Sequence, residues 1–573
     1  MKKRKFLLFS VVLVIIVFGS MTFASVSYPF VSDYGPAIVN WGNNVKYGGV
    51  LTEVLPSGVQ SYNLNPFIGG SVNGLVSDGL IYEPLIYVNL NGDTTYMLGT
   101  AYKWEDDNLI LAFKIRKNVQ WSDGTPFTAN DVAFTFNYLK AHPSIDTSGI
   151  WSPSNNLASV SASDDTVFFK FSQPDTALLL FIESEPIIPE HIWSNIEDPS
   201  KFADTNPVGT GPFIFKSFDP NLNYAIYVKN SNYWMKGRPY LDEVDIFSVN
   251  SNTTALLDLI SHKADLGNIF IFDPQKSYVA KDPSVNKIWW PLTMQWVMTL
   301  NDAKYPFNIP EFRKALSLAI NYKQIAESNY PGLGAWYDPA LLSYPQKSWL
   351  DPALTSLASS LVVYDPQKAQ EMLASIGFKK NAAGQLCAPD GKPLPTYGIN
   401  VVAGWTDNDE EAMEVHQDLE KIGLKTNVNL MTPGACYASL QSGTFDMSPG
   451  GSNNMSWTPS PYLSYYTAFS PSLTAPIGQT AVSNFSRYTN PLITAALNIY
   501  KSTSDPRLQK QAIYSIERII LDDLPLIPLY SGSMWQEYNT INLVGWPDED
   551  YPYMISYANG AGGEPLYLNV HLK

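Results

Sequence analysis

A strand, helix, strand succession in the C-terminal half is the feature that most limits the possible folds of this chain. Residues 399–403 alternate between apolar and other side chains, as in a strand with one buried face. Apolar residues then recur at helical spacing from Ala412 to Ile422, Gly423 ends the helix, and alternation resumes over 424–430. Such a unit joins neighbouring strands through a helix that covers their sheet. We therefore predict an α/β fold.

The spacing of apolar residues changes along the chain. Strands with few helices dominate 81–204, where the turn-forming stretch WSDGTPFTAND, residues 121–131, separates a predicted strand from a helix capped by Thr128. From about Phe307 the period approaches that of a helix. The helix expected after Asp365 is the most clearly bounded, since a capping residue and a proline precede it and a glycine follows it.

Helix spacing returns from about Arg507 to Leu521, and the stretch DLPLIPLY that follows is either a return strand or a linker. In the first half, NPVGTGPFIF, residues 206–215, places two glycines around Thr210. We expect a sharp backbone bend there, at a crossing between lobes. A chain of 573 residues is too long for one ordinary core, so two to four domains are expected.

The N-terminus has the pattern of an export signal. Residues 2–5 are basic, 6–18 are almost entirely apolar, and Thr22 and Ala24 occupy the small-residue positions before a cleavage site. We expect residues 1–24 to be a signal peptide, with a retained membrane anchor as the alternative. We expect the mature chain to be exported to the periplasm or the outer face of the cytoplasmic membrane.

The mature chain is strongly acidic. The formal charge of −16 becomes −20 once the four basic residues of the signal are removed. This balance argues against nucleic acid or an anionic lipid surface as a partner. Cys387 and Cys436 are the two cysteines, and sequence alone leaves open whether they form a disulfide or stay free.

No catalytic or metal-binding pattern stands out. The five histidines are scattered without metal-ligand spacing, and we find no phosphate-binding loop or nucleophile motif. Acidic pairs such as Asp522-Asp523 are typical of a solvated surface, so a secreted glycoside hydrolase is the weaker reading. We therefore expect a binding protein that is not an enzyme, without cofactor or metal.

The ligand site is predicted from topology. In an open α/β sheet, ligands lie beyond the carboxyl ends of strands, and Trp405 and Asp407 follow the strand at 399–403. Asn453, Asn454 and Trp457 follow a second short strand at 445–447. An indole offers a flat apolar face to a sugar ring, while carboxylate and amide groups bond to hydroxyls. For Asp407, capping of the following helix is an equal alternative.

Nine stretches in order resemble the family 5 extracellular solute-binding proteins of ABC importers. They are YGGVLTEV, NLNPF, WSDGTPFTANDVAFTF, NPVGTGPF, NYWMKGRPYLDEV, RKALSLAI, YDPQKAQEMLASIGF, GTFDM and LDDLPLIPLY. The resemblance implies a two-lobed fold like that of type II periplasmic binding proteins, with an extra inserted lobe. We assign 46–80, 206–300 and 531–573 to lobe I, 81–205 to the inserted lobe II, and 301–530 to lobe III.

The same resemblance implies a ligand and partners. GWTD at 404–407 and GWPDEDYPY at 545–553 look like the branch that binds cellobiose and related β-linked oligosaccharides. An oligopeptide is the alternative ligand, and Asn63 and Asn65 complete the expected binding residues. The expected partners are the transmembrane subunits of an ABC permease, with the chain itself a monomer. The lobes would close over the ligand about hinges near 206–215 and 523–530.

Overall fold

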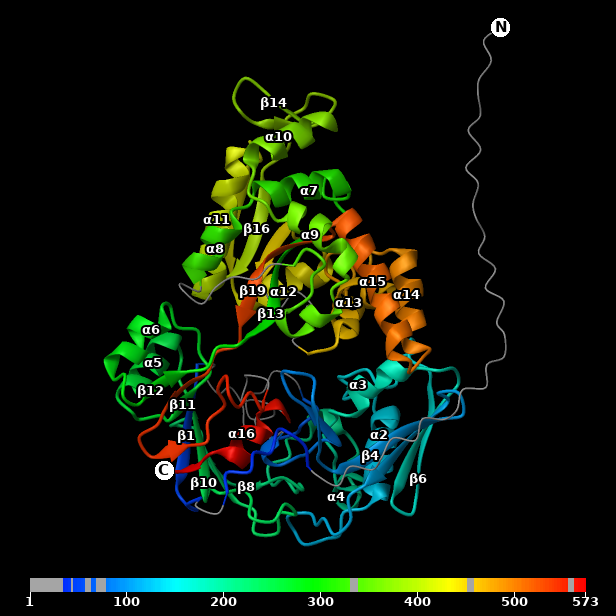
Figure 1. Cartoon of the computed structure of the whole chain (residues 1–573), viewed down its shortest axis with the longest axis vertical. Helices are drawn as coiled ribbons and strands as arrows, with labels where there is room; N and C mark the ends of the chain where they lie inside the picture. Colours follow the sequence, from blue (N-terminus) through cyan, green and yellow to red (C-terminus); the bar gives the residue numbers. More distant parts are fainter. Residues whose placement is uncertain are drawn as a thin grey trace.

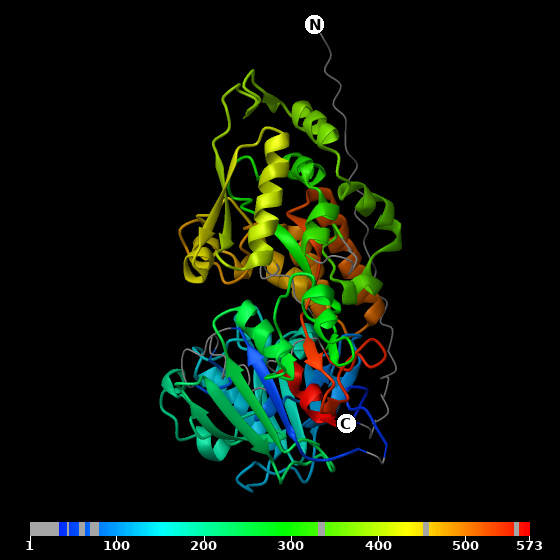
Figure 2. The same ribbon diagram turned by 90° about the vertical axis from the view of Figure 1, so that its left-hand side faces the viewer.

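The computed structural model describes residues 34–42, 45–56, 63–68, 79–329, 338–450, 458–554 and 561–573. They form two bodies, one above the other in Figure 1, and a quarter turn in Figure 2 shows the same division. The predicted signal, residues 1–24, lies outside the described residues. Among the helices of the described ranges, none combines the length and apolar character that a membrane crossing requires.

Three large sheets organise the described chain. The seven-stranded sheet has the order β12 (Asn286–Ile288), β20 (Glu537–Asn539), β11 (Leu266–Gly267), β1 (Val50–Leu55), β10 (Glu243–Ser248), β9 (Tyr224–Lys229), β8 (Phe213–Asp219). The five-stranded sheet has the order β17 (Thr426–Met431), β16 (Tyr397–Val402), β18 (Met447–Gly450), β13 (Leu292–Leu300), β19 (Leu526–Ser533). The four-stranded sheet has the order β4 (Gly99–Glu105), β5 (Ile110–Ile115), β7 (Thr166–Phe171), β6 (Leu157–Ser163).

We name the three lobes after these sheets, and helices pack around each of them (Figure 1). The seven-stranded lobe carries α5 (Asn252–Ile260), α6 (Pro274–Ser277) and α16 (Glu564–Asn569), and the four-stranded lobe carries α2 (Ala129–Ala141), α3 (Leu179–Ile182) and α4 (Glu190–Trp193). The five-stranded lobe carries α7 (Pro310–Ala319), α8 (Tyr322–Asn329), α9 (Thr355–Leu361), α10 (Pro366–Ser375), α11 (Thr406–Lys421), α12 (Pro433–Ser442), α13 (Pro461–Phe469), α14 (Pro491–Lys501) and α15 (Pro506–Asp523). Short two-stranded pairs are β2 (Ile86–Val88) with β3 (Thr94–Tyr96), β14 (Lys379–Lys380) with β15 (Leu386–Cys387), and β21 (Leu543–Val544) with β22 (His571–Leu572). The predicted α/β class is confirmed.

The predicted strand, helix, strand unit forms as β16, α11 and β17, with β16 and β17 parallel. Gly423 takes a φ of +85° after the helix, which explains why a glycine stands there. β16 runs parallel to β18, and β18 runs antiparallel to β13, which starts next to the seven-stranded lobe. The carboxyl end of β16 therefore faces the seven-stranded lobe.

Two segments connect the seven-stranded and five-stranded sheets. Residues 289–291 lie between β12 and β13, and residues 534–536 lie between β19 and β20. Phe270 packs on both, with ring centroids 6.3 Å from Trp290 and 5.7 Å from Trp535. Trp290 Nε1 also donates a 2.6 Å hydrogen bond to Glu537 Oε1. Aromatic packing thus fixes both connections.

These connections correct two expectations. Residues 523–530, expected as a hinge, lie at the end of α15 and inside β19, within the five-stranded lobe. β13, residues 292–300, belongs to the same five-stranded sheet, so the segment 206–300 that we assigned to lobe I ends before residue 292. Alternation within an apolar strand does not indicate which of two sheets the strand joins. This explains why the expected segment of lobe I extends to residue 300.

The bend expected around the glycines at 209 and 211 is present, because residues 210–212 bend directly before β8 begins. Neither glycine has a positive φ, so the bend does not depend on a left-handed glycine conformation. A Cβ at either position would overlap the backbone of Ile81, which means that two segments approach closely there.

The capped helix after residue 128 is confirmed, because Thr128 and Asp131 form a capping box. Cys387 and Cys436 are both free and buried.

Candidate functional site

A cavity of about 750 Å³ lies between the four-stranded and five-stranded lobes. Its walls come from β2 and the loop before β3, from α3, from residues 345–349, and from the segment 458–463. Met534 extends it to one of the two connections between the large sheets. The volume falls within the range of small-molecule binding sites, and a position between lobes is typical of them.

Aromatic side chains form part of the cavity walls. Tyr102 comes from β4, Trp349 from the turn before α9, and Tyr500 from α14. Tyr102 and Trp349 are half-buried, so their rings keep an accessible face. Tyr500 is buried and stacks on Tyr462 with ring centroids 4.7 Å apart, which holds its ring in place. These rings offer the flat apolar faces that pyranose rings stack against.

The polar lining is almost entirely uncharged. Hydroxyl and amide side chains come from Asn91, Thr94, Ser184, Ser348, Thr458, Ser460 and Gln509. Within the described part of the chain, the lining includes no lysine, arginine, histidine or aspartate. Among the described lining residues, Glu183 contributes the one carboxyl group, and burial raises the pKa of that group to about 8. The cavity thus suits a neutral ligand that carries many hydroxyls.

The predicted residues Trp405 and Asp407 lie at the carboxyl end of β16. Trp405 precedes α11 and is 42% exposed, with its amide donating to the carbonyl oxygen of Val402 at 3.3 Å. Asp407 is buried in the first turn of α11. Burial raises its pKa to about 6, although the amides of Asp407 and Asn408 donate to its carboxylate. Neither residue is among those that line the 750 Å³ cavity.

The other predicted residues fall in two places. Asn65 is buried, its amide donates to the carbonyl oxygens of Pro199 and Phe202 at 3.0 and 2.8 Å, and its oxygen accepts from the amide of Phe67. Asn63 Oδ1 accepts from the amide of Asn65 at 3.0 Å. These bonds fix the backbone around NLNPF. Ligand binding by Asn63 and Asn65 stays a prediction.

Asn453, Asn454 and Trp457 lie outside the described residues. The residues that come next, Thr458 to Ser460, line the cavity. Ligand binding by Asn453, Asn454 and Trp457 stays a prediction.

Sequence reasoning missed the cavity residues Tyr102, Trp349, Tyr500 and Glu183. They come from four segments far apart in the chain, and none lies in a motif. A signal existed for Glu183 alone, because it directly follows the apolar run Leu178–Ile182. A carboxylate that directly follows an apolar run is expected to lie close to buried apolar side chains.

Comparison with known proteins gives consistent similarities. The family described as bacterial extracellular solute-binding proteins, family 5 Middle, matches residues 94–472. The oligopeptide-binding protein AppA of Bacillus subtilis is 25% identical over 461 residues, covering 79% of this chain and 81% of AppA. The glutathione-binding protein GsiB of Salmonella paratyphi A is 24% identical over 483 residues, covering 82% and 88%.

Solved structures extend the similarity to the three-dimensional level. A periplasmic oligopeptide-binding protein of an ABC transporter from Thermotoga maritima, crystallised with mannohexaose bound, has a TM-score of 0.78 at 26% identity, covering 91% of this chain and 98% of that one. A second crystal structure of the Thermotoga protein has a TM-score of 0.82 at the same identity, with 91% and 99% covered.

Proposed function

Because the chain belongs to the bacterial extracellular solute-binding proteins of family 5, we propose that it captures an uncharged oligosaccharide for an ABC importer. The chain is the solute-binding component of such an importer, and its family is one of binding proteins. The ligand is held between lobes and delivered to the transmembrane subunits of the permease, with the chain acting as a monomer. The preferred ligand is a β-linked oligosaccharide of the cellobiose kind.

The chemistry of the cavity lining is the observation that carries the choice of ligand. A bound peptide brings a terminal ammonium and a terminal carboxylate, and each needs an opposite charge once it leaves water. Among the described residues the lining has no cationic side chain for the carboxylate. A sugar needs stacking faces and hydroxyl partners, which Tyr102, Trp349 and the amide and hydroxyl groups supply.

The Thermotoga protein supports this choice, since it carries mannohexaose despite being named for oligopeptides. The alternative ligand, an oligopeptide, is favoured by the names of AppA and of the Thermotoga protein itself. Trp405 adds a further exposed ring at the end of β16 that faces the seven-stranded lobe. We assign it to the same ligand, as a second stacking surface.

A melting-temperature screen tests the proposal. A ligand that binds the folded protein raises the melting temperature by mass action, by an amount that grows with its concentration. We expect a rise with at least one of cellobiose, laminaribiose, mannobiose and mannohexaose, and none with a mixed tripeptide pool. A rise with the peptides and with none of the sugars would replace the proposed ligand by the alternative.

A further inference from the structure

Glu183 is the residue whose setting is least explained by the fold. It directly follows α3 and lines the cavity together with the apolar side chains of Leu179, Leu180 and Ile86. Its backbone is fixed, because the amide of Ile86 donates a 2.9 Å hydrogen bond to its carbonyl oxygen. Its carboxyl group has neither a hydrogen bond nor an ion pair to any residue in the described ranges. A half-buried carboxyl in this state lacks the partners that such groups normally have.

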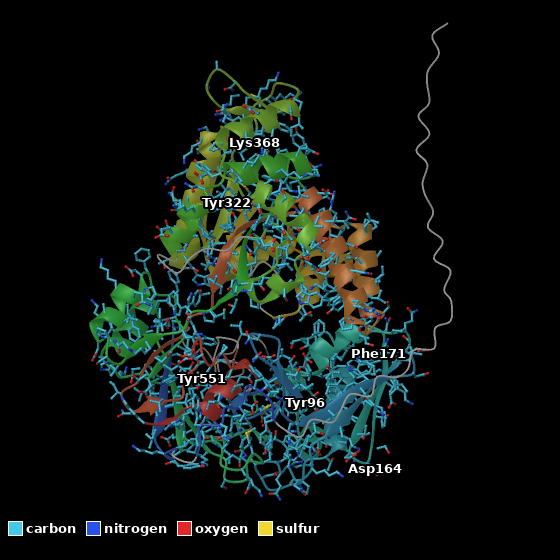
Figure 3. All side chains as sticks on the ribbon, viewed as in Figure 1. Tyr96, Asp164, Phe171, Tyr322, Lys368 and Tyr551 are labelled. Atoms are coloured by element: carbon cyan, nitrogen blue, oxygen red, sulfur yellow. The ribbon has the colours of Figure 1, made fainter. Side chains whose placement is uncertain are left out.

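The groups that face Glu183 are phenols, not cations. Tyr96 of β3, labelled in Figure 3, and Tyr500 of α14 both interact electrostatically with Glu183. Among the described residues, the tyrosines that line the cavity are Tyr87, Tyr102 and Tyr500. Burial raises the pKa of Glu183 to about 8. The carboxyl is therefore mostly protonated at neutral pH before a ligand binds.

Charged residues near the cavity point elsewhere. Glu185 is buried, interacts with Ser148 and Asp146, and is not among the residues that line the cavity. Lys510 donates to the carbonyl oxygen of Ser348 at 2.8 Å but is not among the lining residues. Glu183 thus lines the cavity, and its carboxyl has no partner of opposite charge in the described chain.

We propose that Glu183 orients the sugar by accepting hydrogen bonds from two neighbouring hydroxyls, and that ligand binding releases the proton of Glu183 to the solvent. This inference rests on the proposed oligosaccharide ligand and specifies how the site recognises it. A carboxylate has two oxygens that can each accept a hydroxyl donor, a geometry that a vicinal diol matches. The required chemistry is a pair of adjacent free hydroxyls on an uncharged ligand.

Proton release follows from the same contacts. Two hydroxyl donors stabilise the charged form of the carboxyl, so the pKa of Glu183 falls when the sugar is bound. The proton that leaves Glu183 passes to the buffer, and the two sugar hydroxyls keep their own protons. A ligand that lowers the pKa of its site binds more tightly as the pH rises, until the free site is itself ionised.

Titration calorimetry at different pH values tests this inference with cellobiose, laminaribiose, mannobiose and mannohexaose as probes. We expect the Kd of the sugar that binds to fall roughly tenfold or more from about pH 6 to about pH 8.5. At about pH 7, buffers with different ionisation enthalpies should report the release of nearly one proton per ligand. Glu183→Gln should bind more weakly at high pH, with no proton release and a flat pH profile.

Two further variants separate recognition from folding. Glu183→Asp keeps a carboxyl and should keep the pH dependence with lower affinity, and Glu190→Gln, at an exposed glutamate of α4, should match the wild type. Sugar binding without proton release would overturn this inference and leave the proposed function standing. Heat from a tripeptide pool and from none of the sugars would overturn both. A pH dependence that persists in Glu183→Gln would also contradict the assignment.

Discussion

The hydroxyl of Thr176 donates a 2.7 Å hydrogen bond to the carbonyl oxygen of Thr503, which joins the four-stranded lobe to the five-stranded lobe. Beside it, Lys501 Nζ lies 3.4 Å from Asp175 Oδ2 and donates to the carbonyl oxygen of Ser154 at 3.0 Å. Figure 1 shows the same meeting point, where α14 reaches down towards α3. Tyr500 and Gln509, which precede and follow Lys501 and Thr503 in the chain, line the cavity, and Met534 lines it from one of the two connections between the large sheets.

The contact predicts a stability effect for Lys501→Met. Asp175 is buried, and burial raises its pKa while the charge of Lys501 counteracts that rise. Without Lys501, the buried carboxyl of Asp175 loses the positive charge that favours its ionised form. We therefore expect the free energy of unfolding to fall by about 1–3 kcal/mol. Urea unfolding measures this change in the free energy of unfolding. Lys392→Met is the matched control, because the Lys392 and Asp390 side chains are 83% and 54% exposed, and an exposed pair contributes little.

A loss of equal size in both variants would show that the buried position of Lys501 does not matter. No loss in either would contradict the importance of the contact between the two lobes.

Trp405→Ala should weaken oligosaccharide binding. The change removes a stacking face and should cost about 1–3 kcal/mol, roughly ten- to a hundredfold in Kd, with little loss of fold stability because the side chain is 42% exposed. Trp349→Ala should have an effect of similar size, since that ring lines the cavity. Tyr364→Ala, at another exposed aromatic residue outside the cavity, serves as the control. If calorimetry gives Trp405→Ala the same Kd as the wild type, the ligand lies away from the end of β16.

Buried carboxyls predict that the protein is more stable at mildly acidic than at alkaline pH. Burial is the main cause that raises the pKa of Glu53 from 4.5 to about 7, despite hydrogen bonds from Tyr567 and Asn268. Glu53 therefore holds its proton more tightly in the folded protein than in the unfolded chain. Its stabilising contribution is complete below about pH 4.5 and is lost as the pH rises through about 7, up to about 3 kcal/mol.

The same sign holds for Glu185 and Asp338, whose pKa values burial raises to about 7. Asp165 acts in the opposite direction, because hydrogen bonds from Lys114 and Lys117 hold its pKa low, but it titrates only at more acidic pH. Urea unfolding at about pH 5 and about pH 8 should give the larger free energy at the lower value. Glu53→Gln should reduce the difference, and an equal difference in that variant would exclude Glu53 as a source.

Gly209→Ala should destabilise the protein strongly. A Cβ at this position would overlap the carbonyl oxygen of Ile81, and backbone on both sides must move to accept it. We expect a loss of more than about 2 kcal/mol in the free energy of unfolding. Gly434→Ala is the control, because an added Cβ there meets nothing within 4 Å. An unchanged midpoint of urea unfolding for Gly209→Ala would contradict the close approach of the two segments.

Local patterns explain what could be predicted from the sequence. α10 begins where it was expected, because Asp365 accepts a hydrogen bond from the amide of Lys368 and Pro366 occupies the first turn. The unit of β16, α11 and β17 was also predictable, since apolar spacing reports which face of each element is buried. These features depend on residues within a few positions of each other.

Long-range relations explain what could not be predicted. Trp349 and Tyr500 meet with ring centroids 6.4 Å apart although 151 positions separate them, and no local pattern reports that contact. The position of the connections at 289–291 and 534–536 depends on which sheet β13 joins. The position of Trp405 at the end of a strand could be predicted because it is a local feature, whereas the cavity walls come from two lobes.

The most direct test of the central claim is titration calorimetry of the wild-type protein against cellobiose, laminaribiose, mannobiose, mannohexaose and a mixed tripeptide pool. A cavity lining without a cationic side chain among the described residues predicts saturable heat from at least one sugar and none from the peptides. Saturable heat from the peptides, with none from any of the four sugars, would contradict the claim that this chain carries an oligosaccharide.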